Sequence, residues 1–240
     1  MIVNLNPHVS VDCVIFGFNG GKLNVLLIER EKVPGSHIQG HKLKLPGSLI
    51  TETEELDTSA TRTLKELTGL DNIFLKQFGV FGSPHRLSPP EDLAWLRKTS
   101  GLMVDRVVTV AYYSLIKIAE SNITEKTIWH PIDQLPELIF DHNHIVDKAL
   151  EALRSEIRTE PLCFELLPKK FTIRQMQVLY EAILGERLDN RNFRKKVRPM
   201  KFLIPLPEKE KNFNHKPAQL YKFDKKIYER HRKVLSGFNL

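Results

Sequence analysis

The sequence predicts an α+β domain followed by a smaller, basic domain of the helix-turn-helix class. Strand-like and helix-like segments alternate over residues 8–136, a pattern typical of layered α+β folds. Positive charge gathers in the last third, where 19 of the 36 Lys and Arg but only seven of the 29 Asp and Glu lie between Pro168 and Leu240, a net of +12. The preceding part keeps 17 basic and 22 acidic residues, a net of −5. This division favours a nucleic-acid-binding module joined to another domain, and the apolar content of the basic part argues against a solvated tail.

The first predicted elements are two strands and a helix. Residues 8–30 predict a β-hairpin, because two apolar and β-branched runs flank the turn residues NGG. Residues 56–68 predict a helix that ends at Gly69. Further strands are predicted at residues 72–82 and 106–116.

An insertion with two adjacent prolines separates those two later strands. It spans residues 85–103 and contains a short predicted helix near residues 92–98. Residues 142–158 then have the apolar spacing of a helix. Because two prolines follow in TEPLCFELLPKK, we expect domains at residues 1–158 and 159–240.

The basic domain begins with a clear helix signal. Thr172 and Gln175 form a capping-box pattern, and the helix should run to Gly185. Asp189 can cap a second, basic helix over residues 190–200, which completes a helix-turn-helix. Two short strands at residues 201–207 and 218–224, around a wing, and a final basic helix at residues 223–235 predict a winged helix-turn-helix.

Sequence-specific DNA binding needs donors that reach base edges and others that hold phosphates. The start of the second helix offers Asn190, Arg191, Asn192 and Arg194 for bases. Phosphate contacts are expected from other residues of the two helices and the wing: Arg174, Lys195, Lys196, Arg198, Lys211, His215 and Lys216. Each residue alone could simply be a soluble surface group, but the whole cluster on this pattern favours double-stranded DNA as a partner.

Residues 48–70 resemble a Nudix box, whose pattern is G-x5-E-x7-R-E-U-x-E-E-x-G-U with U aliphatic. Glu54, Arg62 and Glu66 match it, but Ser48, Thr63 and Leu67 replace the Gly and two of the Glu residues. Mg²⁺ requires carboxylate oxygens, and diphosphate cleavage uses the ion to neutralise charge and activate water. The resemblance therefore implies a degenerate site that binds a ligand without catalysis, with no metal and no cofactor.

The whole chain resembles the Nudix-related transcriptional regulators. Residues 164–197 are similar to their C-terminal domain, and VLLIER, LPG, FGVFG, RVVTVAYY and FDHNHIV occur in the family order. The resemblance implies an α/β/α Nudix sandwich that senses an effector, followed by a DNA-binding winged helix. It also implies a homodimer, a palindromic operator and repression relieved by the effector. The insertion over residues 87–103 departs from the family pattern.

Two effectors are open within this family. One branch responds to ADP-ribose and governs NAD metabolism, and another, found in Bacteroidetes, responds to L-arabinose and governs carbohydrate catabolism. The lost carboxylates and the acidic first domain favour the neutral sugar, L-arabinose. We expect the sugar to be bound by Lys44, Glu29, Gln39, His85 and Arg86. The alternative for Lys44 and Glu29 is a cross-strand surface pair.

Two other classes of function remain open at this point. An active Nudix hydrolase of nucleoside diphosphate sugars would rely on Glu54, Arg62 and Glu66, and a basic RNA-binding protein would prefer single-stranded RNA. The two cysteines lack metal-type spacing, which favours a reducing compartment. We expect no leader sequence, no membrane span and a cytoplasmic location.

Overall fold

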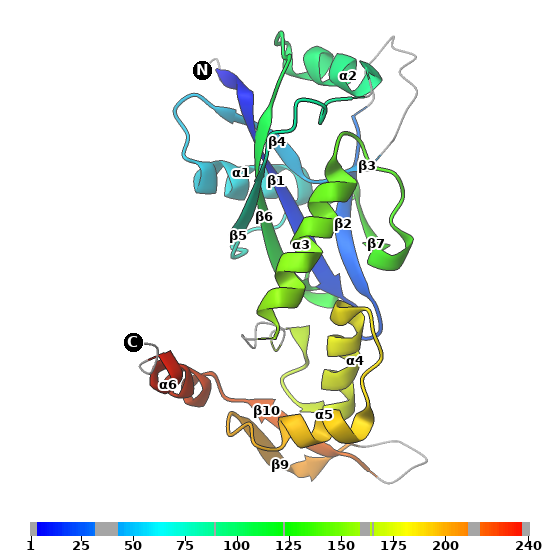
Figure 1. The fold of residues 1–240 in the computed structure, drawn as a ribbon, viewed down its shortest axis with the longest axis vertical. Helices are drawn as coiled ribbons and strands as arrows, with labels where there is room; N and C mark the ends of the chain where they lie inside the picture. The colour runs from blue at the N-terminus through cyan, green and yellow to red at the C-terminus, as the bar shows by residue number, and fades with distance from the viewer. Residues whose placement is uncertain are drawn as a thin grey trace. The chain divides into compact units, whose positions relative to one another are not determined.

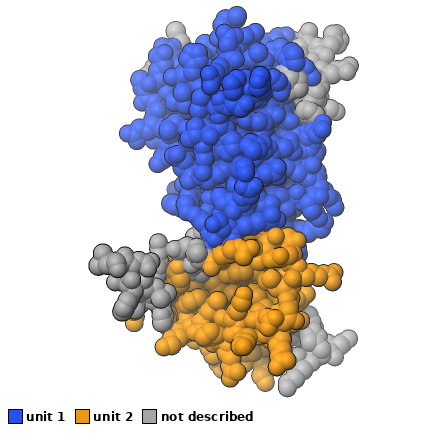
Figure 2. All heavy atoms as spheres, in the orientation of Figure 1, with its two compact units in different colours: residues 1–156 blue, residues 157–240 orange. Residues whose placement is uncertain are grey.

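The structure is a computed structural model of the 240-residue chain. The part of the chain that it describes consists of residues 4–31, 43–88, 90–121, 123–158, 164, 166–210 and 217–236, without the side chains of 120 and 231–236. It separates into two compact units, Met1–Glu156 and Ile157–Leu240 (Figure 2). The expected division, after residue 158, falls two residues later.

The first unit is built on a mixed β-sheet. Its described strands are β1 (Leu5–Phe18), β2 (Leu23–Glu29), β3 (Leu43–Lys44), β4 (Gly47–Thr51), β5 (Lys76–Phe81), β6 (Val108–Lys117) and β7 (Thr127–Pro131). The sheet order is β3-β2-β1-β6-β5, with β4 also paired to β1 and β7 to β2. Only the central β1–β6 pair is parallel among these pairings. The predicted hairpin is confirmed, with Phe16 opposite Val25.

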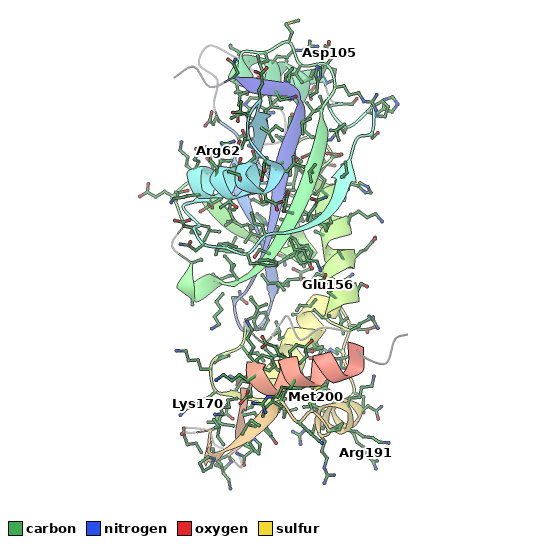
Figure 3. The ribbon with its side chains drawn as sticks, turned by 90° about the vertical axis from the view of Figure 1, so that its left-hand side faces the viewer. Arg62, Asp105, Glu156, Lys170, Arg191 and Met200 are labelled. Atoms are coloured by element: carbon green, nitrogen blue, oxygen red, sulfur yellow. The ribbon has the colours of Figure 1, made fainter. Side chains whose placement is uncertain are left out.

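Helices cover both faces of this sheet. Helix α1 (Leu56–Thr68) and helix α3 (His142–Glu156) lie on opposite sides of it (Figures 1 and 3). Successive side chains of a strand point to opposite faces. Val11, Cys13 and Ile15 of β1 therefore pack with Leu64 of α1 in a buried core, and the residues between them face α3. The predicted α/β/α sandwich is confirmed, as is the end of α1 at Gly69, whose φ is +79°.

The predicted insertion forms a longer helix than expected. Helix α2 spans Pro90–Ser100, and its flanking residues build a small apolar core of their own. Leu87, Val104 and Val107 are buried there against Leu49 of β4. Short 3-10 helices at Ile118–Glu120 and Ile132–Gln134 border β7. The insertion is thus packed onto the sandwich and is not a solvated loop.

The second unit has the elements of a winged helix. In chain order they are β8 (Phe171–Thr172), α4 (Ile173–Leu184), α5 (Asn190–Val197), β9 (Leu203–Lys209), β10 (Gln219–Phe223) and α6 (Lys225–Ser236). Strand β10 pairs antiparallel with both β8 and β9. Strand β9 begins and ends two residues later than predicted, and β8 was missed because two residues give no periodic signal.

Local side-chain chemistry fixes the ends of the two central helices. Both bonds of the predicted capping box between Thr172 and Gln175 form, and Asp189 accepts from the backbone N of Asn192 at 2.8 Å. The expected extension of α5 to residue 200 is wrong. Proline cannot donate a helical hydrogen bond and restricts the residue before it, so α5 ends at Val197, ahead of Pro199.

Candidate functional site

The surviving charges of the Nudix-like box bind one another. Arg62 donates from Nε to Glu54 Oε1 at 2.7 Å and from Nη2 to Glu54 Oε2 at 2.8 Å, and its Nη1 reaches Glu66 Oε2 at 2.9 Å. The Arg62 hydrogen bonds hold the pKa of the Glu54 carboxyl below its ordinary value. Arg62 lies on α1 within the first unit (Figure 3). A bidentate pair of this kind keeps Glu54 ionised and already neutralised.

The substituted box positions offer no further carboxylate. Thr63 is buried, and its hydroxyl has no hydrogen-bond partner within the described residues. Leu67 places an apolar side chain on the wall of a cavity beside the box. No group of three or more His, Cys, Asp or Glu side chains in the described ranges is arranged to hold a metal ion.

A cluster of buried charges lies between the sheet and α3. Asp12 of β1 accepts from Thr109 Oγ1 at 2.7 Å and lies 3.6 Å from Nη2 of Arg86. Arg86 also donates to both carboxylate oxygens of Asp141, at 3.0 and 3.2 Å. Arg86 and Asp12 are each only 4% exposed. Buried charges need such pairing, because an unpaired charge in the interior costs several kcal/mol (roughly 3–5 when one partner is removed).

His142 and Lys44 extend this cluster toward the box. Nδ1 of His142 accepts from the backbone N of Leu45 at 3.0 Å, which leaves Nε2 as the protonated nitrogen 3.5 Å from Asp12 Oδ1. Burial lowers the pKa of His142 to about 4, against the attraction of Asp12. Lys44 donates to the backbone oxygen of Gly47 at 2.8 Å, and burial lowers the pKa of its ammonium group.

Gly47 lets the backbone approach this cluster closely. A Cβ added to Gly47 would lie 1.9 Å from Oδ1 of Asp12 and 2.8 Å from the backbone oxygen of Val11. No side chain fits at that position. The fold therefore requires glycine at this position of the LPG run for a steric reason that is independent of any ligand.

Two of the predicted effector residues face one cleft. Lys44 and Glu29 both line a cavity of about 590 Å³ with residues of the box and of α2. Arg86 lies with Lys44 on a smaller cavity of about 60 Å³. His85 is an exposed turn residue that lines neither cavity, and Gln39 falls outside the described residues.

The alternative of a cross-strand surface pair between Lys44 and Glu29 is wrong. Lys44 stands opposite Ile28 in the β2–β3 register, and Glu29 stands opposite Leu43. Lys44 is 8% exposed, and its Nζ lies 5.8 Å from the centre of the Trp95 ring. Lys44 is thus a buried cation at the back of the cleft.

Helix α5 of the second unit exposes most of its cations. Phe193 and Val197 are buried, as predicted, and the other residues of the helix are exposed. Arg191 projects outward from α5 (Figure 3). On one edge of the helix, a groove of about 1020 Å³ is shared by four predicted DNA-binding residues: Arg174, Asn190, Arg194 and Arg198. Positive side chains beside a winged-helix groove suit a phosphate backbone.

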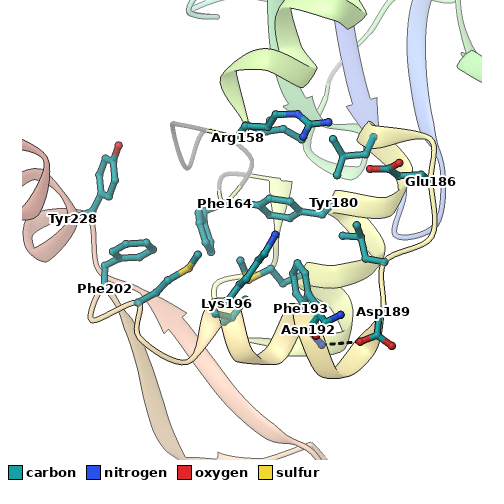
Figure 4. Close-up of a pocket in the computed structure, with 16 residues that line it drawn as sticks. Arg158, Phe164, Tyr180, Glu186, Asp189, Asn192, Phe193, Lys196, Phe202 and Tyr228 are labelled. Atoms are coloured by element: carbon teal, nitrogen blue, oxygen red, sulfur yellow. Dashed lines mark hydrogen bonds between the residues drawn. The ribbon is translucent and has the colours of Figure 1, made fainter. Parts of the chain in front are cut away.

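The other edge of α5 faces a different cavity. Asn192 and Lys196 line a mainly apolar space of about 550 Å³, and Lys196 points into it (Figure 4). Arg191 and Lys195 lie between the two edges. The predicted wing residues Lys211, His215 and Lys216 fall outside the described residues. The single predicted set of DNA-binding residues thus divides between two edges of one helix.

Comparisons with known families match both units. The NUDIX domain model matches residues 6–153, and the model of the NrtR DNA-binding winged helix domain matches residues 163–223. Over 93% of this chain and 85% of the relative, the chain is 30% identical to the "ADPR responsive transcriptional repressor NtrR" of Acinetobacter baylyi. The chain belongs to the NrtR family of Nudix-related transcriptional regulators.

A solved structure of an NrtR protein agrees with this assignment. A crystal structure of Shewanella oneidensis NrtR complexed with a 27mer DNA is 27% identical, covers 90% of this chain and 93% of that chain, and has a TM-score of 0.65. A MutT/nudix family protein from Enterococcus faecalis has a TM-score of 0.64 over 91% of this chain and 87% of that chain; at 23% identity it shows the shared fold alone. In the described part of this NrtR-type chain, no helix is long and apolar enough to cross a membrane.

Several site residues escaped the sequence reasoning. Asp12 could have been predicted from the sequence, because an acid inside the apolar run HVSVDCVIFGF indicates a paired buried charge. Asp92, Trp95 and His142 gave no comparable signal. Their roles depend on contacts with residues 48 to 97 positions away in the chain.

Proposed function

We propose that this chain is a transcriptional repressor that binds operator DNA through its winged helix and is released by ADP-ribose, or a closely related nucleotide, bound in its Nudix unit. The observation that carries the proposal is the 30% identity to the ADPR responsive repressor NtrR, because the matched region covers 93% of this chain and includes both units. The likeness to an NrtR crystallised with DNA supports the same division of roles.

The effector in this proposal differs from the expected L-arabinose. The sugar was favoured because the box lacks metal carboxylates, but the comparisons do not support it, and the relative's name specifies ADPR. The cleft of about 590 Å³ has the size of a ligand site, which is typically roughly 300–1,000 Å³. Regulation of carbohydrate catabolism goes with the arabinose expectation and is likewise not proposed.

The Nudix unit binds its ligand without cleaving it in this proposal. Glu54 and Glu66, the remaining box acids, are both engaged by Arg62, and Leu67 cannot bind an ion. A product assay on ADP-ribose with Mg²⁺ or Mn²⁺ tests this point. Turnover above about 1 s⁻¹, the low end of ordinary enzyme rates, would show that the chain is an active hydrolase and overturn this part of the proposal.

The DNA partner is a palindromic duplex read by a homodimer. The groove beside α5 would follow a phosphate backbone, with Arg174 and Arg198 as its cations. Arg191 and Asn190, at the exposed start of the helix, are proposed to reach base edges. Two α5 helices related by a twofold axis would then read two half-sites.

The test is a gel-shift experiment on duplex DNA from the upstream region of the chain's own gene neighbourhood. ADP-ribose and L-arabinose are titrated separately against the full chain and DNA. We expect a shifted band that ADP-ribose removes and L-arabinose leaves in place. Release by L-arabinose alone would overturn the nucleotide assignment. Tighter binding to single-stranded RNA than to duplex DNA would overturn the repressor assignment.

A further inference from the structure

Helix α2 is fastened to the Nudix unit by buried polar bonds. Asp92 is fully buried and accepts from Arg30 Nη1 at 2.8 Å and from the backbone N of Phe140 at 3.1 Å. The indole Nε1 of Trp95 donates to the backbone oxygen of Glu31 at 3.0 Å. These bonds satisfy groups that would be costly to bury alone. The insertion therefore holds one fixed position relative to the end of β2.

This fixed helix forms one wall of the cleft. Trp95, Leu96, Thr99 and Ser100 line the cavity of about 590 Å³ from the α2 side, opposite residues of the box helix. Trp95 and Leu96 provide an apolar surface. The hydroxyls of Thr99 and Ser100 donate to backbone oxygens of their own helix, at 2.9 and 2.7 Å, so toward the cleft they can only accept hydrogen bonds.

The polar groups beside α2 are mostly acceptors. Glu29 and Glu31 line the cleft, and neither carboxylate is paired with another described side chain. Two lysines also line the cleft: Lys44, which is already held by Gly47 and by the Trp95 ring, and Lys126. Carboxylates accept hydrogen bonds from sugar hydroxyls and repel phosphates. The chemistry of this wall thus fits a neutral ring with several hydroxyls next to an apolar face.

We infer that the α2 wall receives the terminal ribose of the effector and makes Trp95, Leu96 and Thr99 specificity-determining residues. The inference rests on the proposed function, because it assigns one part of the same effector to one part of the same cleft. The diphosphate and adenosine would then lie toward the rest of the cleft, away from Glu29 and Glu31. L-arabinose presents the same kind of hydroxyl-bearing ring as a free sugar.

Isothermal titration calorimetry on the full chain tests the inference, with ADP-ribose and ADP as matched ligands that differ in the terminal ribose. Thr99→Phe fills the cleft from α2, and Ala94→Phe adds the same bulk at an exposed position of α2 that lines no described cavity. We expect wild type to bind ADP-ribose more tightly than ADP. Thr99→Phe should weaken ADP-ribose binding by about fivefold or more and leave ADP binding unchanged, since overpacking a filled site costs roughly that factor or more.

Folding and operator binding are controls for both variants. Thermal unfolding and gel shift should match wild type, and Thr99→Leu replaces Thr99→Phe if the larger side chain prevents folding. Wild-type affinity for ADP-ribose in the Thr99 variant, or equal loss of ADP-ribose and ADP, overturns the inference and leaves the proposed function standing. If wild type binds L-arabinose but not ADP-ribose, and Thr99→Phe no longer binds L-arabinose, the α2 wall still binds a sugar ring but the nucleotide assignment is overturned. Binding of neither ligand by wild type overturns both.

Discussion

The two units use charge in opposite ways. In the Nudix unit the central charges are buried and matched, as in the Arg30–Asp92 pair and the bonds from Arg86 to Asp141. In the winged-helix unit the cations of α5 are exposed and make no ion pair with another described residue. Buried pairs stabilise one geometry, whereas exposed cations can neutralise the phosphates of a polyanion and release its condensed counterions. The first arrangement suits a shaped ligand cleft and the second suits DNA.

The largest expected effect comes from breaking a buried pair. Asp92→Ala leaves Arg30, whose side chain is 8% exposed, without its partner and also removes the anchor of α2. We expect a loss of about 3–5 kcal/mol in the free energy of unfolding, measured with urea. Glu151→Ala, at the exposed Lys148–Glu151 pair, is the matched control and should cost less than about 1 kcal/mol. Equal losses would remove the contrast between buried and exposed pairs.

Acid should weaken the Nudix unit through His142. Its pKa falls from 6.5 to about 4 on burial, so the unfolded chain binds this proton more readily than the folded chain. The stability that neutral His142 contributes is therefore complete above pH 6.5 and declines as the pH falls toward 4, by up to about 3 kcal/mol. His142→Asn, whose side-chain oxygen can still accept from Leu45, should lose this part of the pH dependence. An unchanged dependence in urea titrations between pH 6.5 and 4 would contradict the assignment.

The exposed cations should matter for DNA and hardly at all for folding. Arg194→Ala should cost about 1–3 kcal/mol in operator binding while leaving the unfolding free energy nearly unchanged. Fluorescence anisotropy on operator and random duplexes measures the effect, and Lys148→Ala in the other unit removes one charge as a control. Equal loss on both duplexes would assign Arg194 to phosphate contact alone, and no loss on either would remove it from the interface.

The smallest effect concerns the cap of α4. Thr172→Ala removes the bond that its hydroxyl accepts from the backbone N of Gln175, at 3.1 Å, which is half of the capping box. The expected cost is about 1 kcal/mol in a thermal or urea unfolding experiment. Thr58→Ala, at an exposed position inside α1, serves as the control and should change stability by less. A cost at Thr172 no larger than at Thr58 would mean that the cap does not hold this helix.

Local signals predicted most of the fold. The hairpin of β1 and β2, the end of α1 at Gly69 and the capped helices α4 and α5 each follow from residues within one or two turns of one another. One failure was local in origin and the other was not. Helix α5 ends early because of Pro199, whereas α2 is longer than its periodic signal because its anchors, Arg30 and Phe140, lie just after β2 and just before α3.

The candidate site was less predictable from the sequence. Lys44 was singled out because of its position before the box, but its burial depends on Trp95 and Asp12, which lie far away in the chain. Arg86 and Asp141 pair across 55 residues, a relation that no local pattern contains. The cations of α5 were identifiable from composition, whereas their division between two edges required the helix orientation.

The most direct test of the account is the affinity of the full chain for ADP-ribose, measured by calorimetry with and without saturating operator duplex. Coupling between two binding sites is reciprocal, so a ligand that weakens DNA binding must itself bind more weakly to the DNA complex by the same factor. We predict a decrease of about 5- to 150-fold in ADP-ribose affinity when operator is bound, equal to the decrease that ADP-ribose causes in operator affinity. Equal affinity with and without DNA would contradict the central claim that the two units are coupled.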